Sequence, residues 1–446
     1  MCLIGLKVQR WPDRAVLQDT GTNGSESWLD SACCPIGRIS RERVKSQTMH
    51  SEPSQQQSVL GDRQALWILL GGMLGMMVAM GIGRFAFTPI LPLMQRDLGM
   101  SNTVAGWLAG LNYVGYLAGA ILCTVCPRLL RCRFFTASIL VLSIVSTFAM
   151  GLTTAVAWWG VLRLVGGVAS AVLFIVISAE VTESLLRSRR SRWSGALYGG
   201  IGLGIAFSGL LVPLLDAFGD WALAWIGMGG SALVLAMIGL ALGRRRGQVG
   251  SAAAEYDLRL SGIKGLWLLS AAYFFEGLGY VVSATFLVAI VALTPGLDAL
   301  APYSWVAVGL AAVPSTFFWP YLARKVGHQR ALLAAYILQA SGILASIWAD
   351  TVIEVLFVAV SFGGTFLGIV ALTLAEGSRR LPGDGRRAAA FLTACFGIGQ
   401  VLGPIIAGML ADRRDGFAIP LALAAACVAA GAICILVDRR FLQPSF

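Results

Sequence analysis

Three charged side chains lie inside long apolar stretches of this 446-residue chain, and these residues are the ones best suited to chemistry. They are Arg84, Arg163 and Glu276. An arginine at the centre of a lipid bilayer costs roughly 2.5 to 3.5 kcal/mol even on insertion-based scales, so such residues are usually functional. A planar guanidinium group can hold a carboxylate or a phosphate through two parallel hydrogen bonds. A buried carboxyl group can take up and release a proton when a neighbouring charge moves.

The charges of these three residues do not cancel. Glu276 can neutralise one guanidinium group, which leaves the other arginine in need of an anion. The pattern therefore favours an anionic or acid-bearing ligand at Arg84 or Arg163, with Glu276 as a proton-coupling site. A structural interpretation stays open, in which Arg163 braces the packing of helices and Arg84 pairs with Glu276 as a lock.

Other polar residues in the apolar stretches could hydrogen-bond a substrate. The candidates are Asn112, Tyr113, Tyr280 and Gln400, although ordinary bonding between helices explains each of them equally well. Three charged residues near the ends of apolar stretches could form a cytoplasmic gate or could simply be solvated. These are Glu180, Arg187 and Glu376.

Composition places the chain in a membrane. Hydrophobic residues make up 57% of the sequence and charged residues 13%, whereas soluble domains carry about 25% charged residues. The formal charge of +11 is spread over many short loops, so no nucleic-acid partner is expected. The nine cysteines show no disulfide framework. Cys123 and Cys126 form a CxxC pattern, but they close an apolar run and are interpreted as packing residues.

The sequence does not predict an enzyme. There are two histidines, and the HExxH, GxSxG and GxxxxGK[ST] patterns are missing from the chain. We therefore expect no catalytic residues, no metal, no cofactor and no ATP site.

The elements that must position these residues are twelve apolar runs, each long enough to cross a hydrocarbon core of about 30 Å as a helix. Residues 1–64 before them are polar and are predicted to be disordered, and Met49 is a candidate start that would make residues 1–48 dispensable. Pro89 and Pro92 in the first run suggest a tilt, a kink or an early stop. The runs are residues 66–93, 104–126, 134–152, 156–181, 193–215, 221–243, 266–293, 303–323, 331–349, 353–377, 388–410 and 417–438.

The second half of the chain repeats the first. The glycines of Gly81-Ile82-Gly83 recur as Gly277-Leu278-Gly279, Gly166-Gly167 recurs as Gly363-Gly364, and the segment 198–202 recurs as 396–399, all at nearly one offset. Internal duplication in an apolar chain of this length is typical of transporters built from two bundles. The predicted fold is therefore all-α, with one six-helix bundle at 65–243, a cytoplasmic linker at 244–265, a second bundle at 266–438 and a tail at 439–446.

Loop charges predict the orientation of the chain. Loops after even-numbered runs are rich in arginine, whereas loops after odd-numbered runs carry only Arg96, Arg413 and Arg414. By the positive-inside rule, both termini are expected in the cytoplasm of a cell whose inner membrane holds the protein.

The segments GRFAFTPILP at 83–92 and EGLGY at 276–280 resemble the YbfB/YjiJ-like branch of the major facilitator superfamily, MFS. The resemblance covers 66–437 and implies the MFS fold and transport by alternating access. Arg163 with Gly166-Gly167 is similar to a signature linked to proton coupling. Because helices 1, 4 and 7 line the central cavity in this superfamily, the resemblance also implies that Arg84, Arg163 and Glu276 share one cavity. Arg324 stands where the superfamily has a loop aspartate, which puts a latch built on that acid in doubt.

The expected function is secondary active transport of a small organic solute, anionic or polar, coupled to protons. An alternative is a broad-specificity exporter of amphipathic drugs or metabolites, and a polytopic membrane enzyme or sensor is a third interpretation. The expected partners are the lipid bilayer, a small-molecule substrate and the proton, and the protein is expected to act as a monomer.

Overall fold

The computed structural model describes residues 61–126, 128–243, 265–381, 384–414 and 416–438. The predictions made for residues 1–60, including the Met49 start, for the linker at 244–264 and for the tail at 439–446 lie outside the described residues. Helix α1 begins at Asp62, so the last residues assigned to the N-terminal extension are helical.

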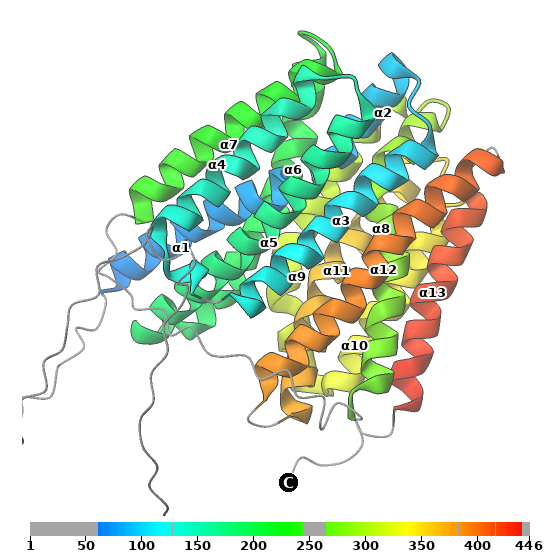
Figure 1. The fold of residues 1–446 in the computed structure, drawn as a ribbon. Coiled ribbons are helices and arrows are strands. Elements are labelled where there is room, and N and C mark those ends of the chain that lie inside the picture. Colours follow the sequence, from blue (N-terminus) through cyan, green and yellow to red (C-terminus); the bar gives the residue numbers. More distant parts are fainter. Residues whose placement is uncertain (1–60, 127, 244–264, 382–383, 415, 439–446) are drawn as a thin grey trace, which may run out of the picture. The chain divides into compact units, whose positions relative to one another are not determined.

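All regular secondary structure in the described residues is helical and no strand is present among them, which confirms the predicted all-α fold (Figure 1). Short turns of helix, η2 (Leu129–Arg131), η3 (Met150–Leu152), η4 (Ser191–Trp193) and η6 (Asp298–Leu300), join some of the long ones. The long elements are α1 (Asp62–Met76), η1 (Met77–Ile82), α2 (Phe87–Leu98), α3 (Asn102–Val125), α4 (Arg133–Ala149), α5 (Val156–Arg187), α6 (Ser194–Asp216), α7 (Trp221–Gly243), α8 (Trp267–Leu293), α9 (Ala301–Val326), α10 (His328–Ala345), α11 (Val352–Arg380), α12 (Gly385–Arg413) and α13 (Ala418–Val437).

Eleven of the described helices are long and apolar enough to cross a membrane, with α1, η1 and α2 counted as one span from Asp62 to Leu98. Helix α10 is the twelfth long helix and is not among them, because its eighteen residues begin with the polar run 328–330 and include Gln339. It packs beside α11 and α13, in the place that a twelfth span would occupy.

Several helix ends follow from local sequence. Ser101 caps α3 by accepting a hydrogen bond from the backbone N–H of Val104. Thr351 and Glu354 form a capping box at the start of α11. Helix α2 ends at Gly99, whose φ of 63° is in the left-handed region that glycine adopts at little cost.

The first span is interrupted at a different place from the one predicted. It does not end at the prolines, since α2 continues through Pro92 to Leu98. Pro89 is the third residue of α2, where a backbone N–H has no partner within the helix. The break lies earlier, where the π-helix η1 ends and Arg84 follows in a turn. The backbone N–H groups of Gly83 to Ala86 still bond to carbonyl groups of the preceding turn, so the interruption changes the direction of the side chains and leaves these donors bonded. Short π-helical segments within helices are frequent at functional sites.

The sequence repeat corresponds to a repeat of close helix packing. A Cβ atom at Gly81 would lie 2.5 Å from Gly204 Cα, and one at Gly277 would lie 2.3 Å from the backbone oxygen of Phe396. The first contact joins the first span to α6, and the second joins α8 to α12, which are the equivalent helices of the second half. Gly167 in α5 and Gly363 in α11 approach the backbones of α3 and α9 in the same equivalent way. Small residues at these places let the helix backbones touch.

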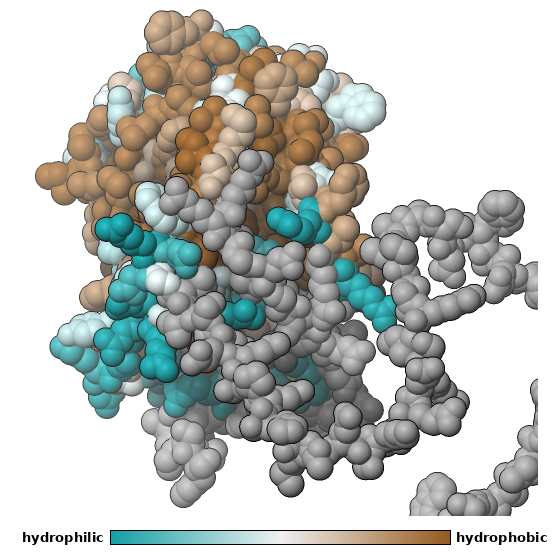
Figure 2. All heavy atoms as spheres, turned by 90° about the vertical axis from the view of Figure 1, so that its left-hand side faces the viewer, coloured by the Kyte–Doolittle hydropathy of each residue, from teal (hydrophilic) through white to brown (hydrophobic). Residues whose placement is uncertain are grey.

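The outer surface suits a lipid environment. Large apolar side chains are exposed around the helices, for example Trp107 at 50%, Phe134 at 81% and Ile353 at 80%. Helices α1, α4 and α7 lie along one edge of Figure 1, and Figure 2 shows hydrophobic side chains over the upper part of that face and hydrophilic ones gathered at its lower end. A soluble monomer rarely exposes so much contiguous apolar surface, whereas a bilayer covers it.

Two neighbouring glycines offer a matched test of this packing. Gly363→Ala is expected to lower the free energy of unfolding by about 1 to 3 kcal/mol, because its Cβ atom would lie 2.2 Å from the backbone oxygen of Val308. Gly364→Ala should change it by less than about 0.5 kcal/mol, because nothing lies within 4 Å of that Cβ position. The measurement is the midpoint of thermal unfolding in detergent. Equal midpoints for the two variants would contradict the packing described.

Candidate functional site

A cavity of about 1380 Å³ lies between the two halves of the described structure. Both halves contribute residues to the wall of the cavity. The cavity extends from Arg84 to Arg192 and Arg324, and we call the part beside Arg192 and Arg324 the basic end. Helix α6 begins at this end and α9 finishes there. The lining side chains used below are Arg84, Phe85, Tyr116, Tyr273, Tyr280, Phe366, Phe396 and Gln400.

Arg84 stands at the break in the first span, and its guanidinium group is held by aromatic faces. The Cζ atom lies 4.3 Å from the ring centroid of Tyr113 and 4.4 Å from that of Tyr116, one turn further along α3. These contacts stabilise the cation without a counter-charge. Arg84 is only 5% exposed, yet its Nε and Nη2 atoms have no hydrogen-bond partner among the described residues. Two buried donors of this side chain therefore lack a partner among the described residues.

The facing wall comes from the second half and is made of aromatic rings. We call Tyr273 and Tyr280 of α8, Phe366 of α11 and Phe396 of α12 the ring set. The Tyr273 and Phe396 rings stack at 4.3 Å and 15°, and the Tyr280 ring lies at 12° to Phe396 and at 8° to Phe366. The Tyr280 hydroxyl accepts a hydrogen bond from Gln400 Nε2. The predicted binding residues Tyr280 and Gln400 thus lie together on the cavity wall.

Arg163 is placed differently and does not line this cavity. Its Nε donates a long hydrogen bond of 3.4 Å to the backbone oxygen of Leu108, and its Cζ atom lies 4.6 Å from the ring centroid of Phe87. Asn112 donates to the backbone oxygen of Arg163 at 2.9 Å. These bonds connect α3 and α5, so Arg163 and Asn112 lie together and contribute to helix packing. Tyr113 contacts Arg84 instead.

Glu276 is also turned away from the cavity. Its side chain is buried in the second half and accepts a hydrogen bond of 2.7 Å from Gln339 Nε2 on α10. Neither Arg84 nor Arg163 forms an ion pair with it among the described residues. The prediction that the three charged groups face one shared space is therefore not met. Glu276 lies one helical turn from Tyr273 and from Tyr280 on α8, but it is not among the residues that line the cavity, and its carboxylate is bonded to Gln339 of α10 instead.

The predicted gate residues lie near the basic end. Arg187 bonds Glu183 at 2.6 Å, one turn earlier on α5, and Glu180 is half-buried on the same helix. Glu376 pairs with Arg379 at 3.2 Å and with Arg380 at 2.9 Å. Arg380 also bonds Asp438 at 2.6 Å. Each of these pairs lies within one half, so these contacts tie a half together.

Sequence reasoning missed several residues of the site. Tyr116, Phe366 and Phe396 line the cavity, and Gln339 holds Glu276. Tyr116 could have been found, because its spacing of three residues from Tyr113 puts both on one helix face. Gln339 could also have been found, because it is a polar residue within the apolar run 331–349. Phe366 and Phe396 carry no such signal, because apolar and aromatic residues occupy every face of these helices.

The opposite end of the cavity is closed by contacts between the halves, and we call it the Asp412 end. A Cβ atom at Gly106 of α3 would lie 2.2 Å from the backbone oxygen of Pro404 of α12, and one at Gly309 of α9 would lie 2.3 Å from the backbone nitrogen of Ala206 of α6. Thr88 also donates a buried hydrogen bond to the backbone oxygen of Ala284 in the other half at 2.5 Å.

Asp412 adds a polar contact between the halves. Its two carboxylate oxygens accept hydrogen bonds from the backbone N–H groups of Asn102 at 3.0 Å and of Thr103 at 2.7 Å, which are the first residues of α3. A carboxylate at a helix N-terminus satisfies donors that have no partner in the helix. Asp412 of one half therefore caps a helix of the other half.

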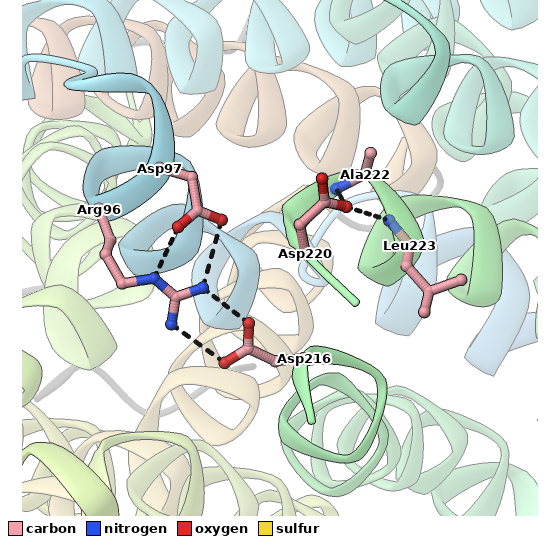
Figure 3. A network of polar contacts seen from close by, with 6 residues as sticks. All are labelled: Arg96, Asp97, Asp216, Asp220, Ala222 and Leu223. Atoms are coloured by element: carbon pink, nitrogen blue, oxygen red, sulfur yellow. Dashed lines mark hydrogen bonds and ion pairs between the residues drawn. The ribbon is translucent and has the colours of Figure 1, made fainter. Parts of the chain in front are cut away.

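A second polar network at this end stays within the first half (Figure 3). Arg96 of α2 bonds Asp97 at 2.7 Å and Asp216 of α6 at 2.8 Å. Beside it, Asp220 accepts from the backbone N–H groups of Ala222 and Leu223 and so caps α7. These bonds stabilise one half as a unit, whereas Asp412 joins the two halves.

The structure consists of two packed helical halves with a cavity between them. The cavity extends to the basic end and is closed at the Asp412 end, an arrangement that is typical of membrane transporters. A family model described as uncharacterised MFS-type transporter YbfB matches residues 76–437, and the chain belongs to this family. The resemblance found in the sequence is confirmed, and the protein is a multi-pass membrane transporter and not an enzyme.

Known proteins with similar sequences or folds agree with this. The uncharacterized transporter YycB of Bacillus subtilis is 26% identical over 349 residues, which cover 75% of this chain and 84% of YycB. NiaP of Bacillus subtilis, provisionally named a niacin/nicotinamide transporter, is 23% identical over 417 residues, 86% of this chain and 96% of NiaP. A bacterial homologue of the human lysosomal transporter Spinster, solved inward-facing and unoccupied, has the same fold with a TM-score of 0.68 at 14% identity, over 87% of this chain and 99% of that one.

The cap made by Asp412 can be tested by hydrogen exchange. Asp412→Ala is expected to speed amide exchange at residues 102–106 and 404–408 by about tenfold, because a lost cap costs about 0.5 to 2 kcal/mol and here also loosens the contact between halves. The matched control is Asp220→Ala, which removes an equivalent cap within one half and should speed exchange only at the start of α7. Exchange confined to residues 102–103 in Asp412→Ala would contradict a role in joining the halves.

Proposed function

We propose that this transporter moves a small organic anion together with protons by alternating access, as a secondary active transporter acting as a single chain. The proposal rests on the environment of Arg84. Arg84 lines the cavity, its guanidinium group lies against the faces of Tyr113 and Tyr116, and two of its donor atoms have no partner among the described residues.

The electrostatics of the cavity wall support an anion. Its described lining residues include the three arginines Arg84, Arg192 and Arg324, and no aspartate or glutamate. Leaving a buried donor unbonded costs about 1 to 3 kcal/mol, more when the group is charged, and an incoming carboxylate would remove that cost at Arg84. Tyr280 and Gln400 on the facing wall supply further polar groups for the ligand.

The arrangement of the two ends supports alternating access. The cavity reaches the basic end and is closed at the Asp412 end by backbone contacts between the halves. Breaking one set of contacts between rigid halves and forming another is the usual way in which such folds expose a central site to alternate sides. With the basic end in the cytoplasm, as the loop charges favour, the structure is an inward-facing state and both termini are cytoplasmic.

Glu276 is proposed as the proton-coupling residue. It is 1% exposed, its Oε2 atom has no hydrogen-bond partner among the described residues, and the partner of its Oε1 atom, Gln339, is neutral. Glu276 follows Tyr273 and precedes Tyr280 by about one helical turn in each case, so a rotation or bend of α8 moves the proton site and the cavity wall together. Coupling would run through this helix and not through a direct contact with Arg84.

A broad exporter of amphipathic compounds is the second candidate, because aromatic residues make up much of the cavity wall. Three arginines without an acid in the described part of that wall repel lipophilic cations, which weighs against the cationic members of that class. The name of the relative NiaP refers to small organic molecules, one of them an acid, and this favours the first candidate.

The anion site predicts a specific loss in Arg84→Gln. Purified wild-type protein should be stabilised against heat by members of a panel of organic acids, and the variant should bind those acids at least about 100-fold more weakly, because a buried charged hydrogen-bond partner is worth about 2 to 5 kcal/mol. Arg163→Gln is the control and should lower the unfolding temperature while keeping acid binding. Stabilisation by lipophilic cations and by no acid would overturn the proposal.

Proton coupling predicts a split phenotype for Glu276→Gln. The amide keeps the size of the side chain but cannot carry a proton, so uptake driven by a pH gradient into proteoliposomes should be lost while exchange of internal for external substrate remains. Gln339→Glu serves as a companion variant that adds a second titratable group beside the first and should shift the pH dependence of uptake. Full gradient-driven accumulation by Glu276→Gln would remove Glu276 from the mechanism.

A further inference from the structure

The rings of the ring set lie parallel to one another in a stack, although its members come from three helices. The angles between the ring planes of neighbouring members are 8°, 12° and 15°. Elsewhere the rings meet in other ways: Phe85 contacts Phe366 edge-on at 74°, and Phe286 meets Phe417 at 45°. All four rings of the set line the cavity, so side chains with one common ring orientation border the space in which a ligand would bind.

Neighbouring side chains fix the orientation of these rings. Gln400 Nε2 donates to the Tyr280 hydroxyl, which restricts rotation of that ring. Phe362, one turn before Phe366 on α11, has nearly the same ring orientation, at 13° to Phe366 and 20° to Tyr280. A wall that is already oriented costs little conformational entropy when a planar group stacks on it.

The ring set and the guanidinium group are neighbours across the cavity. Arg84 Cζ lies 5.5 Å from the Phe85 ring centroid, and the Phe85 ring lies 6.3 Å from that of Phe366. A stack of parallel rings on one half thus lies close to a cation on the other half that has two donors without a partner among the described residues. A ligand that joins the two must have a planar π-face and an anionic group within a few ångströms of each other.

We propose that the cavity selects planar aromatic carboxylates, with the ligand ring stacked parallel to the ring set and the carboxylate on Arg84. The inference rests on the proposed function, since it names the class of anion carried. Offset parallel stacking of aromatic rings at about 4.5 to 7 Å contributes beyond the burial of apolar area. A saturated ring of the same size and charge buries similar area but has no π-face and is thicker, so it should bind more weakly.

The test compares three probes of similar size by calorimetric titration of the purified full chain: benzoate, cyclohexanecarboxylate and the neutral benzamide. Wild-type protein is expected to bind benzoate about tenfold more tightly than cyclohexanecarboxylate and than benzamide. Phe396→Leu, which removes the ring that stacks on both Tyr273 and Tyr280, should reduce the first preference to about threefold or less. Phe286→Leu is the matched control, a buried ring of α8 that does not line the cavity, and should keep it.

The outcomes separate this inference from the proposed function. Equal binding of benzoate and cyclohexanecarboxylate by wild-type protein, or a preference that survives in Phe396→Leu, overturns the inference and leaves anion transport standing. Equal binding of benzoate and benzamide overturns the anion requirement and with it both proposals. If no probe binds, the inference falls, whereas the proposed function falls only if the whole panel of organic acids fails as well.

Discussion

A guanidinium group held by aromatic faces instead of a carboxylate is the interaction on which the rest of this site depends. Tyr113 and Tyr116 lie within 4.4 Å of Arg84 Cζ and stabilise its charge, but aromatic faces accept no strong hydrogen bond from Nε or Nη2. An ion pair with a protein carboxylate would have stabilised the arginine and also blocked it. The protein keeps a buried cation with two donor atoms that have no partner among the described residues, which is a costly arrangement unless a ligand completes it.

The break in the first span makes this arrangement possible. The π-helix η1 ends at Ile82, and Arg84 leaves the helix in a turn where it reaches α3 and the cavity together. Backbone contact at Gly81 and Gly204 holds the broken segment against α6. Irregular backbone at membrane depth is tolerated where protein surrounds it or where it lines a cavity, and both conditions hold here.

The two halves use the same packing for different chemistry. Gly81 and Gly277 occupy equivalent places and bring equivalent pairs of helices into contact, yet the residues that follow them differ. After Gly81 comes Arg84, a cation on the cavity wall, whereas after Gly277 comes Tyr280, a member of the ring set. The backbone packing of the two halves is equivalent, and the candidate site lies where the residues at equivalent positions differ. At the Asp412 end the halves meet through backbone contacts and one carboxylate cap, which are interactions that can form and break as units.

Hydropathy and glycine spacing by themselves determined much about this protein. They predicted an all-helical membrane protein of two repeated halves, because hydropathy and the close approach of helices depend on local sequence, and the segments 83–92 and 276–280 predicted the family. The cost of burying charge made Arg84 a candidate for the site. These sequence patterns did not decide which residue Glu276 bonds, whether Arg163 serves a ligand or the packing of α3 against α5, or that four rings lie parallel to one another. In helices that are apolar on all sides, a shift of one residue turns a side chain by about 100° without changing the hydropathy pattern. Only the packing of helices distant in sequence, such as α8 against α10 and α12, decided which face of each helix met the cavity and which partner each charge received.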